Sequence, residues 1–305
     1  MSRAKPQSAP VSRPQPASFR ESGTGSERLR LLRSQIAGIE AANLAMLPSG
    51  ETPRARIPLG HTGLDRMLVG GLKPGALHEI VAARPGDHPA AASFALALAT
   101  RLKAARNRGS IVWIGEDFAG LEQGALYGPG LAHHGIDPAC FLLVHAASAK
   151  EALWAMEEAL KCRAPAAVMG EIWTAKAYDL AASRRLVLAA QKNATPGLLF
   201  LAGLAGADAL SSGADTRFEV GAWPSAHLAS AARRLPLPGS AAWSIRIAKA
   251  RAGPTGFDRD KVHPVFWTEA CFRDALSLPL AAIPGDGPDH PAGEFGEAKR
   301  RALGP

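Results

Sequence analysis

Residues 78–94 read HEIVAARPGDHPAAASF, in which an apolar run is followed by a loop with two prolines and one glycine and then by an alanine-rich stretch. The apolar run predicts a strand over residues 76–82, and the alanine-rich stretch predicts a helix over residues 90–106. The same alternation recurs along the chain. Further strands are expected at residues 110–115, 140–145, 166–172 and 196–202, and further helices at residues 148–162 and 177–193.

Each of these strands is mostly apolar and alternates with helices. This pattern is typical of a parallel sheet with helices on both faces, so the fold class expected is α/β with a mostly parallel sheet. After residue 220 the pattern changes. Late, antiparallel strands are expected at residues 227–235, 241–250 and 265–268.

The two ends of the chain differ in composition from this middle part. Residues 1–25 are rich in Pro, Ser, Gln and Arg, and residues 279–305 are rich in Pro and Gly, so both are expected to be disordered. Residues 26–56 are expected to form one helix and a linker. The α/β domain is expected over residues 57–278.

The helix expected at residues 26–47 has one apolar face. Ser26 is a suitable N-cap, and Pro48 ends the segment. Because a helix of this length is marginal by itself, the apolar face needs a partner surface, either on its own domain or on another subunit. Its apolar residues are Leu29, Leu32, Ile36, Ile39 and Met46, which are spaced by three and four when Asn43, the single polar interruption, is included.

The net charge of +8 is unevenly distributed along the chain. Residues 1–56 carry nine Lys/Arg against four Asp/Glu, and residues 231–263 carry seven against two. This pattern suits a nucleic-acid contact made by appendages, and equally a solubility charge on mobile ends. No apolar run is long enough to cross a membrane, and no signal peptide precedes the domain, so a cytoplasmic protein is expected. The 3 cysteines lack the spacing of a disulfide framework or a zinc site.

The loop at residues 83–89 stands where a nucleotide-binding α/β protein carries its phosphate-binding loop, GxxxxGK[ST]. In that motif glycine N–H groups wrap the phosphates, the Lys neutralises them, and the Ser or Thr binds Mg²⁺. This loop has no Lys, its Asp87 adds a negative charge, and its prolines remove N–H donors. We therefore expect neither ATP hydrolysis nor a bound cofactor. The residues of this degenerate loop are Arg84, Gly86, Asp87 and His88, of which Arg84 and His88 are the only possible cations.

Residues 57–255 resemble the RecA core in the order and spacing of several short motifs. The lead-in of that core is a small residue with Leu-Asp, then Gly-Gly-Leu, Gly and Glu-Ile, and residues 62–80 match this series. The resemblance implies that Lys249 and Arg251 match two basic residues that reach ATP across a subunit interface.

The resemblance also assigns places to three acidic residues. Glu116 and Asp117 stand where RecA proteins place an acid that activates the attacking water. Gly170 or Glu171 stands where the terminal acid of a strand helps to hold Mg²⁺. Because the loop lacks its own catalytic residues, we interpret Glu116, Asp117 and Glu171 as vestigial.

Among RecA-like proteins, the chain resembles the ImuA family of damage-inducible mutagenesis proteins, which lack clear ATPase motifs. LGHTGLDRMLVGGL at residues 59–72, GALHEI at residues 75–80, WIGE at residues 113–116 and the basic ending at residues 245–251 carry this resemblance. It implies a non-catalytic adaptor in SOS-induced, error-prone translesion synthesis. The implied partners are an ImuB-type inactive Y-family polymerase and an error-prone replicative-type DNA polymerase. RecA, single-stranded DNA and further copies of the chain are other candidates, and association with the nucleoid on damage is expected.

Two other functions remain open, a divergent ATP-dependent recombinase and a SulA-like cell-division inhibitor. The missing Gly-Lys-Thr counts against the recombinase, in which Arg84 or His88 would replace the Lys. The basic late segment counts weakly against the inhibitor. That segment also contains Trp243 and Phe257, which can stack on bases. Its candidate DNA-binding or interface residues are Arg246, Lys249, Arg251, Arg259 and Lys261.

Overall fold

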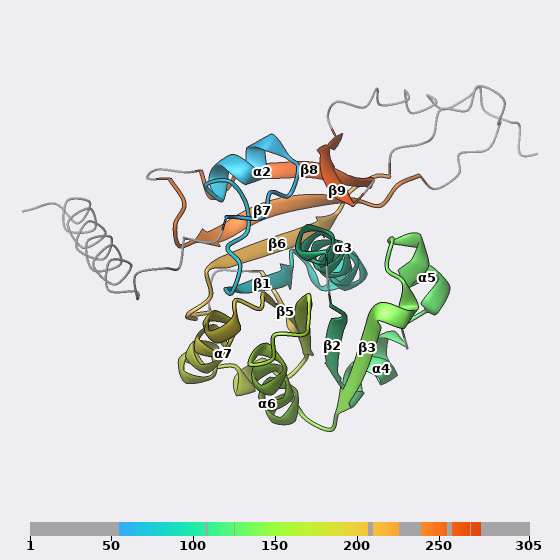
Figure 1. The fold of residues 1–305 in the computed structure, drawn as a ribbon. Coiled ribbons are helices and arrows are strands. Elements are labelled where there is room, and N and C mark those ends of the chain that lie inside the picture. The colour runs from blue at the N-terminus through green and yellow to red at the C-terminus, as the bar shows by residue number, and fades with distance from the viewer. Residues whose placement is uncertain are drawn as a thin grey trace, which may run out of the picture. The chain divides into compact units, whose positions relative to one another are not determined.

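The computed structural model describes residues 55–275, apart from residues 108, 125, 207–209, 226–238, 255–257 and 269. The expected N-terminal helix with most of its linker, the strand expected at residues 227–235 and the C-terminal tail lie outside the described residues. The elements, in which η marks a 3-10 helix (Figure 1), are α2 (Thr62–Met67), β1 (Leu77–Ala82), η1 (Pro85–Asp87), α3 (His88–Arg106), β2 (Ile111–Glu116), α4 (Asp117–Gln123), α5 (Gly128–His133), η2 (Pro138–Cys140), β3 (Phe141–Ala146), α6 (Ala149–Leu160), β4 (Ala167–Ile172), η3 (Ala175–Ala177), α7 (Leu180–Asn193), β5 (Gly197–Ala205), β6 (Thr216–Ala222), β7 (Ala242–Ala250), β8 (Val262–Thr268) and β9 (Cys271–Asp274).

The strands form one sheet in the order β3-β2-β4-β5-β1-β6-β7-β8-β9. All neighbours from β3 to β6 are parallel. From β6 to β9 the neighbours are antiparallel. The expected α/β class with a mostly parallel sheet is confirmed. Strand β6 was not expected, because Arg217 and Glu219 interrupt its apolar sequence.

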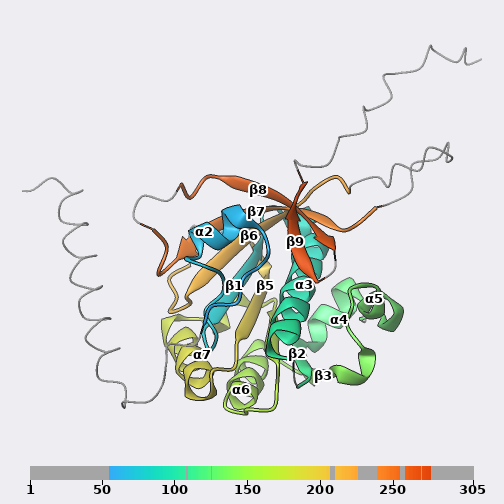
Figure 2. The same cartoon turned by 45° about the horizontal axis from the view of Figure 1, so that its top comes forward.

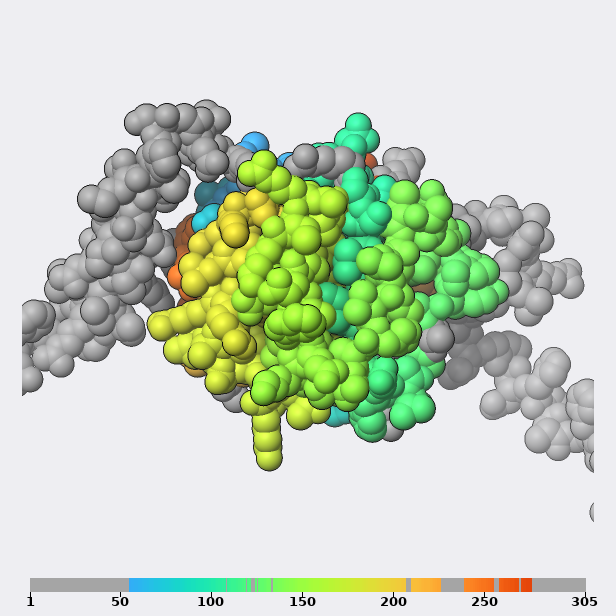
Figure 3. All heavy atoms as spheres, turned by 60° about the horizontal axis from the view of Figure 1, so that its bottom comes forward, coloured from blue at the N-terminus to red at the C-terminus, as the bar shows by residue number. Residues whose placement is uncertain are grey.

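Helices cover both faces of the parallel part of the sheet (Figures 1 and 2). On one face, Phe94 and Leu98 of α3 pack with Ile80 of β1 and Phe218 of β6. On the other face, α6 and α7 lie next to each other and pack on apolar residues of β1, β2, β4 and β5. Figure 3 shows this second face from outside. Within the described ranges, no helix has the length and apolar character needed to span a membrane.

Strand β3 lies at one end of the sheet and departs from the expectation that each strand is covered on both faces. Its Leu142 is 55% exposed and its Leu143 is 37% exposed, although both belong to an apolar run. The reason is position, since β2 is the strand with which β3 pairs and an end strand receives less cover from helices. Apolar sequence alone does not distinguish an end strand from a central one.

The helices on the two faces begin and end at residues suited to these places. The side chain of Asp179 accepts a hydrogen bond from the N–H of Ala182 in the first turn of α7. Helix α3 has Pro89 in its first turn, where the missing N–H costs nothing. It ends at Asn107, whose left-handed backbone, with φ of 48°, lets its N–H reach the carbonyl of Lys103. Helix α3 begins at His88, directly after the loop that follows β1.

Candidate functional site

The side chain of Asp87 forms hydrogen bonds within the loop after β1 and to the neighbouring strand β6. The carboxylate of Asp87 accepts a hydrogen bond from Nε of Arg84 at 3.0 Å, and its other oxygen accepts one from the N–H of Ala222 at 3.1 Å. Asp87 is only 4% exposed. The bond from Arg84 is the main reason why the pKa of Asp87 lies below its ordinary value, and the Ala222 N–H adds to it against the effect of burial. Asp87 thus places a negative charge at the residue before α3, near the helix end that would attract a phosphate, although its side chain accepts no N–H of α3.

Aromatic rings pack beside this loop. The centroid of the His88 ring lies 5.5 Å from that of Trp173, which follows β4, and 6.5 Å from that of Phe200 in β5. Trp173 in turn contacts the ring of Phe118 at 5.6 Å. Among the described residues, Nε2 of His88 has no hydrogen-bond partner although it is buried. Rings therefore pack at the carboxyl ends of β1 and β4, the edge at which open α/β sheets bind ligands.

Glu116, at the end of β2, is used to hold the backbone of a neighbouring segment. Its Oε1 accepts hydrogen bonds from the N–H of Trp173 at 2.9 Å and of Thr174 at 3.2 Å. Its other oxygen accepts one from the hydroxyl of Thr174 at 3.4 Å. Glu116 is 5% exposed. It therefore ties the end of β2 to the segment after β4, rather than facing an open site.

The other two acids have surroundings of their own, although the charge of Glu116 contributes to raising the pKa of Glu171. Glu171 accepts a hydrogen bond from the indole N–H of Trp113 at 3.2 Å, and burial raises the pKa of Glu171. Asp117 is 59% exposed in its side chain and lies 3.9 Å from Nδ1 of His145. Within the part of the chain that the structure describes, no group of three His, Cys, Asp or Glu side chains is arranged to hold a metal ion. Glu116 and Glu171 therefore have hydrogen-bond partners within the chain that serve the structure.

The five late basic residues differ in exposure, with two half-buried and three exposed. Arg246 pairs with Glu219 across β6 and β7, with Nε to Oε1 at 2.9 Å. Lys249 donates from Nζ to the carbonyl of Ser212 at 2.7 Å, and burial lowers the pKa of Lys249. Arg251 donates from Nη2 to the carbonyl of Gly213 at 3.0 Å. Arg259 and Lys261 lie near the start of β8 and, like Arg251, are exposed.

Three buried residues that sequence reasoning did not single out form a polar cluster inside the fold. Glu79 of β1 accepts hydrogen bonds from the hydroxyl of Tyr178 at 2.5 Å and from Nε of Arg217 at 2.7 Å. All three are buried, with Glu79 at 0% exposed. A signal did exist, since Glu79 and Arg217 are charged residues placed inside apolar strand sequences. Opposite charges in two separate strands are a sign of a buried pair.

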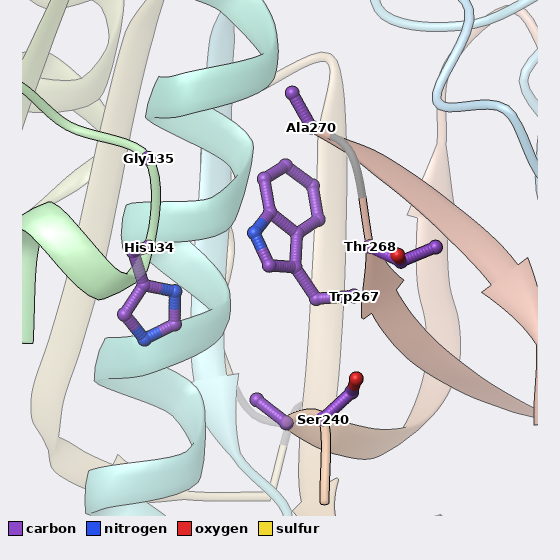
Figure 4. A pocket seen from close by; sticks show the side chains of 7 residues that line it. His134, Gly135, Ser240, Trp267, Thr268 and Ala270 are labelled. Atoms are coloured by element: carbon purple, nitrogen blue, oxygen red, sulfur yellow. The ribbon is translucent and has the colours of Figure 1, made fainter. Parts of the chain in front are cut away.

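A small hollow lies along the side of α3, apart from the loop after β1 (Figure 4). Its volume is about 290 Å³. In Figure 4 the indole of Trp267 and the ring of His134 lie on opposite sides of it. The lining supplies the hydroxyls of Ser240 and Thr268 and the ring of His134, but no Lys, Arg or carboxylate. The lining residues are His134, Gly135, Ser240, Ala241, Trp267, Thr268 and Ala270.

Comparison with known proteins places this geometry in context. A scan of family models finds no match to the chain. Among solved structures, the crystal structure of the RadB recombinase aligns with a TM-score of 0.46 at 15% identity, covering 72% of this chain and 99% of that chain.

Two curated proteins are similar in sequence to part of the chain. Both are named Protein ImuA, from Caulobacter vibrioides strains NA1000 / CB15N and ATCC 19089 / CIP 103742 / CB 15. Each is 32% identical over 150 residues, an alignment that covers 48% of this chain and 58% of the relative. The chain thus spans less than two thirds of the length of these relatives, and it is similar to ImuA proteins over about half of its own length.

Proposed function

We propose that this chain is a RecA-like member of the ImuA family that acts in damage-induced mutagenesis without hydrolysing ATP. The similarity to ImuA over 150 residues supports the class of protein. The motif series at residues 62–80 supports a RecA-like core, because it runs through α2 and into β1, directly before the loop that would bind phosphates.

The observation that carries the proposal is the closure of that loop by Asp87. A phosphate at the start of α3 would compete with a buried carboxylate that already holds Arg84 and the N–H of Ala222. Like charges this close repel strongly when partly removed from water. The same geometry counts against a divergent recombinase, since Arg84 is engaged and the ring of His88 packs on Trp173.

In the proposed role the chain works by binding other proteins. It would connect an ImuB-type inactive Y-family polymerase with an error-prone replicative-type DNA polymerase, in the cytoplasm and at the nucleoid after damage. RecA and single-stranded DNA are further candidate partners. We propose the apolar face of residues 26–47, which lies outside the described residues, as the assembly element. Four or five apolar side chains of this kind can contribute enough buried area for a micromolar contact.

Capture of partners from damaged cells tests this role. A tagged full-length chain is expressed in cells with and without a DNA-damaging agent, and co-purifying proteins are identified by mass spectrometry. We expect a polymerase-like protein to be enriched after damage and to be lost with the double variant Leu32→Glu, Ile36→Glu. Ser34→Glu, Ala41→Glu adds two charges to the opposite face of the same segment and is the matched control. Recovery of no DNA-polymerase relative under either condition would contradict the proposed function.

A further inference from the structure

The connection between β5 and β6 passes over β1. Both strands are parallel to β1 and lie on either side of it, so residues 206–215 must return from one end of the sheet to the other. Leu210 and Ala214 pack in the core that contains α6 and α7, which places the connection on that face. Its described part contains no helix. The backbone carbonyls of this segment therefore need partners from elsewhere.

Three cations from the neighbouring strands supply these partners. Arg217 of β6 donates from Nη2 to the carbonyl of Leu210 at 2.8 Å and to the hydroxyl of Ser212 at 3.2 Å. Lys249 at the end of β7 donates to the carbonyl of Ser212 at 2.7 Å. Beside it, Arg251 donates to the carbonyl of Gly213 at 3.0 Å. The connection is thus held against the sheet by charge-assisted hydrogen bonds to three of its backbone carbonyls.

Glu79 lies beneath this connection and binds a second connection as well. One carboxylate oxygen accepts from Arg217, which also donates to Leu210 and Ser212 of the β5–β6 connection. The other accepts from the hydroxyl of Tyr178, which belongs to the segment between β4 and α7. Because Glu79 is 0% exposed, water cannot replace either donor without opening the structure. Losing the donor from one connection therefore weakens the hold of the carboxylate on the other.

We propose that Glu79 is a positioning residue that couples the β4–α7 and β5–β6 connections into one latch, which keeps Lys249 and Arg251 hydrogen-bonded to their own chain. Opening of either connection would release the other. It would also release Lys249 from the carbonyl of Ser212 and Arg251 from the carbonyl of Gly213, so that both cations could bind phosphates or carboxylates of a partner. This inference does not depend on the proposed function, because it concerns contacts within the fold.

Amide hydrogen exchange measured by NMR tests the coupling. Tyr178→Phe removes one hydroxyl and leaves the ring. The sensitive probes lie in the other connection, where the N–H of Gly213 donates to the hydroxyl of Ser183 and the N–H of Asp215 to the carbonyl of Leu77. We expect exchange at these two amides to speed up by about tenfold, since a hydrogen bond to a charged group is lost. Tyr127→Phe, at a 71% exposed tyrosine, is the matched control and should leave both rates unchanged.

The reverse experiment perturbs the β5–β6 connection and reads the β4–α7 segment. Lys249→Met removes the bond to Ser212, and the probes are the amides of Ala177 and Tyr178, which are hydrogen-bonded within their own segment. We expect the exchange of these two amides to rise at least threefold. On a logarithmic scale this is about half of the tenfold effect expected for Tyr178→Phe. Lys150→Met, at an exposed lysine of α6, is the control and should leave them unchanged.

Two outcomes would overturn the proposal. In one, each variant speeds exchange only in its own connection, which would mean that the two segments open independently. In the other, amides of β2 and β4 speed up by the same factor, which would mean that the variant only lowers global stability. Glu79→Gln adds a third measurement if it folds, with both connections expected to open. Its failure to fold leaves the first two variants decisive, because both retain the buried carboxylate.

Discussion

Asp87 accepts the backbone N–H of Ala222 at 3.1 Å, a hydrogen bond that joins the loop after β1 to the last residue of β6. Asp87 thereby fixes the loop before α3 against the end of β6. Its carboxylate satisfies a strand N–H and the guanidinium of Arg84 at the same time.

We expect no thermal stabilisation of the chain by ATP with Mg²⁺. A ligand that binds the folded state at one hundred times its Kd adds about 2.7 kcal/mol to the free energy of unfolding, which a thermal-shift assay detects easily. The closed loop offers no such site, because Asp87 holds Arg84 and the Ala222 N–H. A clear rise in Tm that disappears in Arg84→Ala would contradict this and would favour the recombinase alternative.

Asp87→Ala is expected to lower the free energy of unfolding by about 1–3 kcal/mol, because the Ala222 N–H and Arg84 lose their acceptor. Urea denaturation followed by circular dichroism measures the change. Asp260→Ala is the matched control. The side chain of Asp260 is 94% exposed, and its ion pair with Arg246 is long, with Oδ1 at 3.8 Å from Nη1. We expect a change within about 0.5 kcal/mol for the control. Equal effects of the two variants would show that the Asp87 contacts contribute nothing to stability.

If the chain binds single-stranded DNA, the exposed Arg259 and Lys261 should carry more of the salt dependence than Lys249. Each phosphate contact that is lost lowers the slope of log affinity against log salt by about 0.7–1. The double variant Arg259→Ala, Lys261→Ala should therefore reduce the slope by about two, measured by fluorescence anisotropy with a labelled oligonucleotide. Lys249→Met should change the slope by less than about one, because its Nζ is held by Ser212. The opposite ranking would assign the contact to Lys249.

The chain should lose stability as the pH falls from 6.5 to about 4, in part because of His263. Burial, with His61 and Lys261 nearby, lowers the pKa of His263 to about 4, and Asp274 opposes the shift. Between these pH values the unfolded state binds a proton that the folded state does not, so the free energy of unfolding decreases with acid. His61, whose pKa is also lowered by burial, acts in the same direction.

Allowing for solvent near the ring, we expect His263 to account for about 2 kcal/mol of this loss. Urea denaturation of the parent and of His263→Gln at several pH values measures it. The slope of stability against pH in this window should be shallower in His263→Gln. His145→Gln, at a side chain that is 64% exposed, should retain the slope of the parent. An unchanged slope in His263→Gln would show that the ring titrates alike in the folded and unfolded states.

Much of the parallel sheet could be predicted from local pattern. The helix expected at residues 90–106 is α3, and the strand expected at residues 166–172 is β4 to within one residue. Such elements are decided by neighbouring residues, since a short apolar run next to a helix-forming stretch buries its own side chains in one way. The poor fit of the loop after β1 to a phosphate is equally a local property. No Lys is present in it to neutralise a phosphate, whatever the rest of the chain does.

Strand β6 and the partners of the site residues could not be predicted in this way. Arg217 and Glu219 make the sequence of β6 look unlike a strand, and they are tolerated there because Glu79 and Arg246 neutralise them. The resemblance to the RecA core predicts that Lys249 and Arg251 reach across a subunit interface. In this structure they bind the β5–β6 connection of their own chain.

The sequence by itself determined the class of fold and the absence of a phosphate-binding lysine, because both depend on residues close together in the chain. Only the tertiary structure decided what the loop and the buried charges do instead. Asp87 meets Ala222 across 135 positions, and Glu79 meets Arg217 across 138. These contacts exist because β6 lies beside β1 in the sheet, and strand order is set by how the whole apolar surface is buried, not by the local alternation of residues.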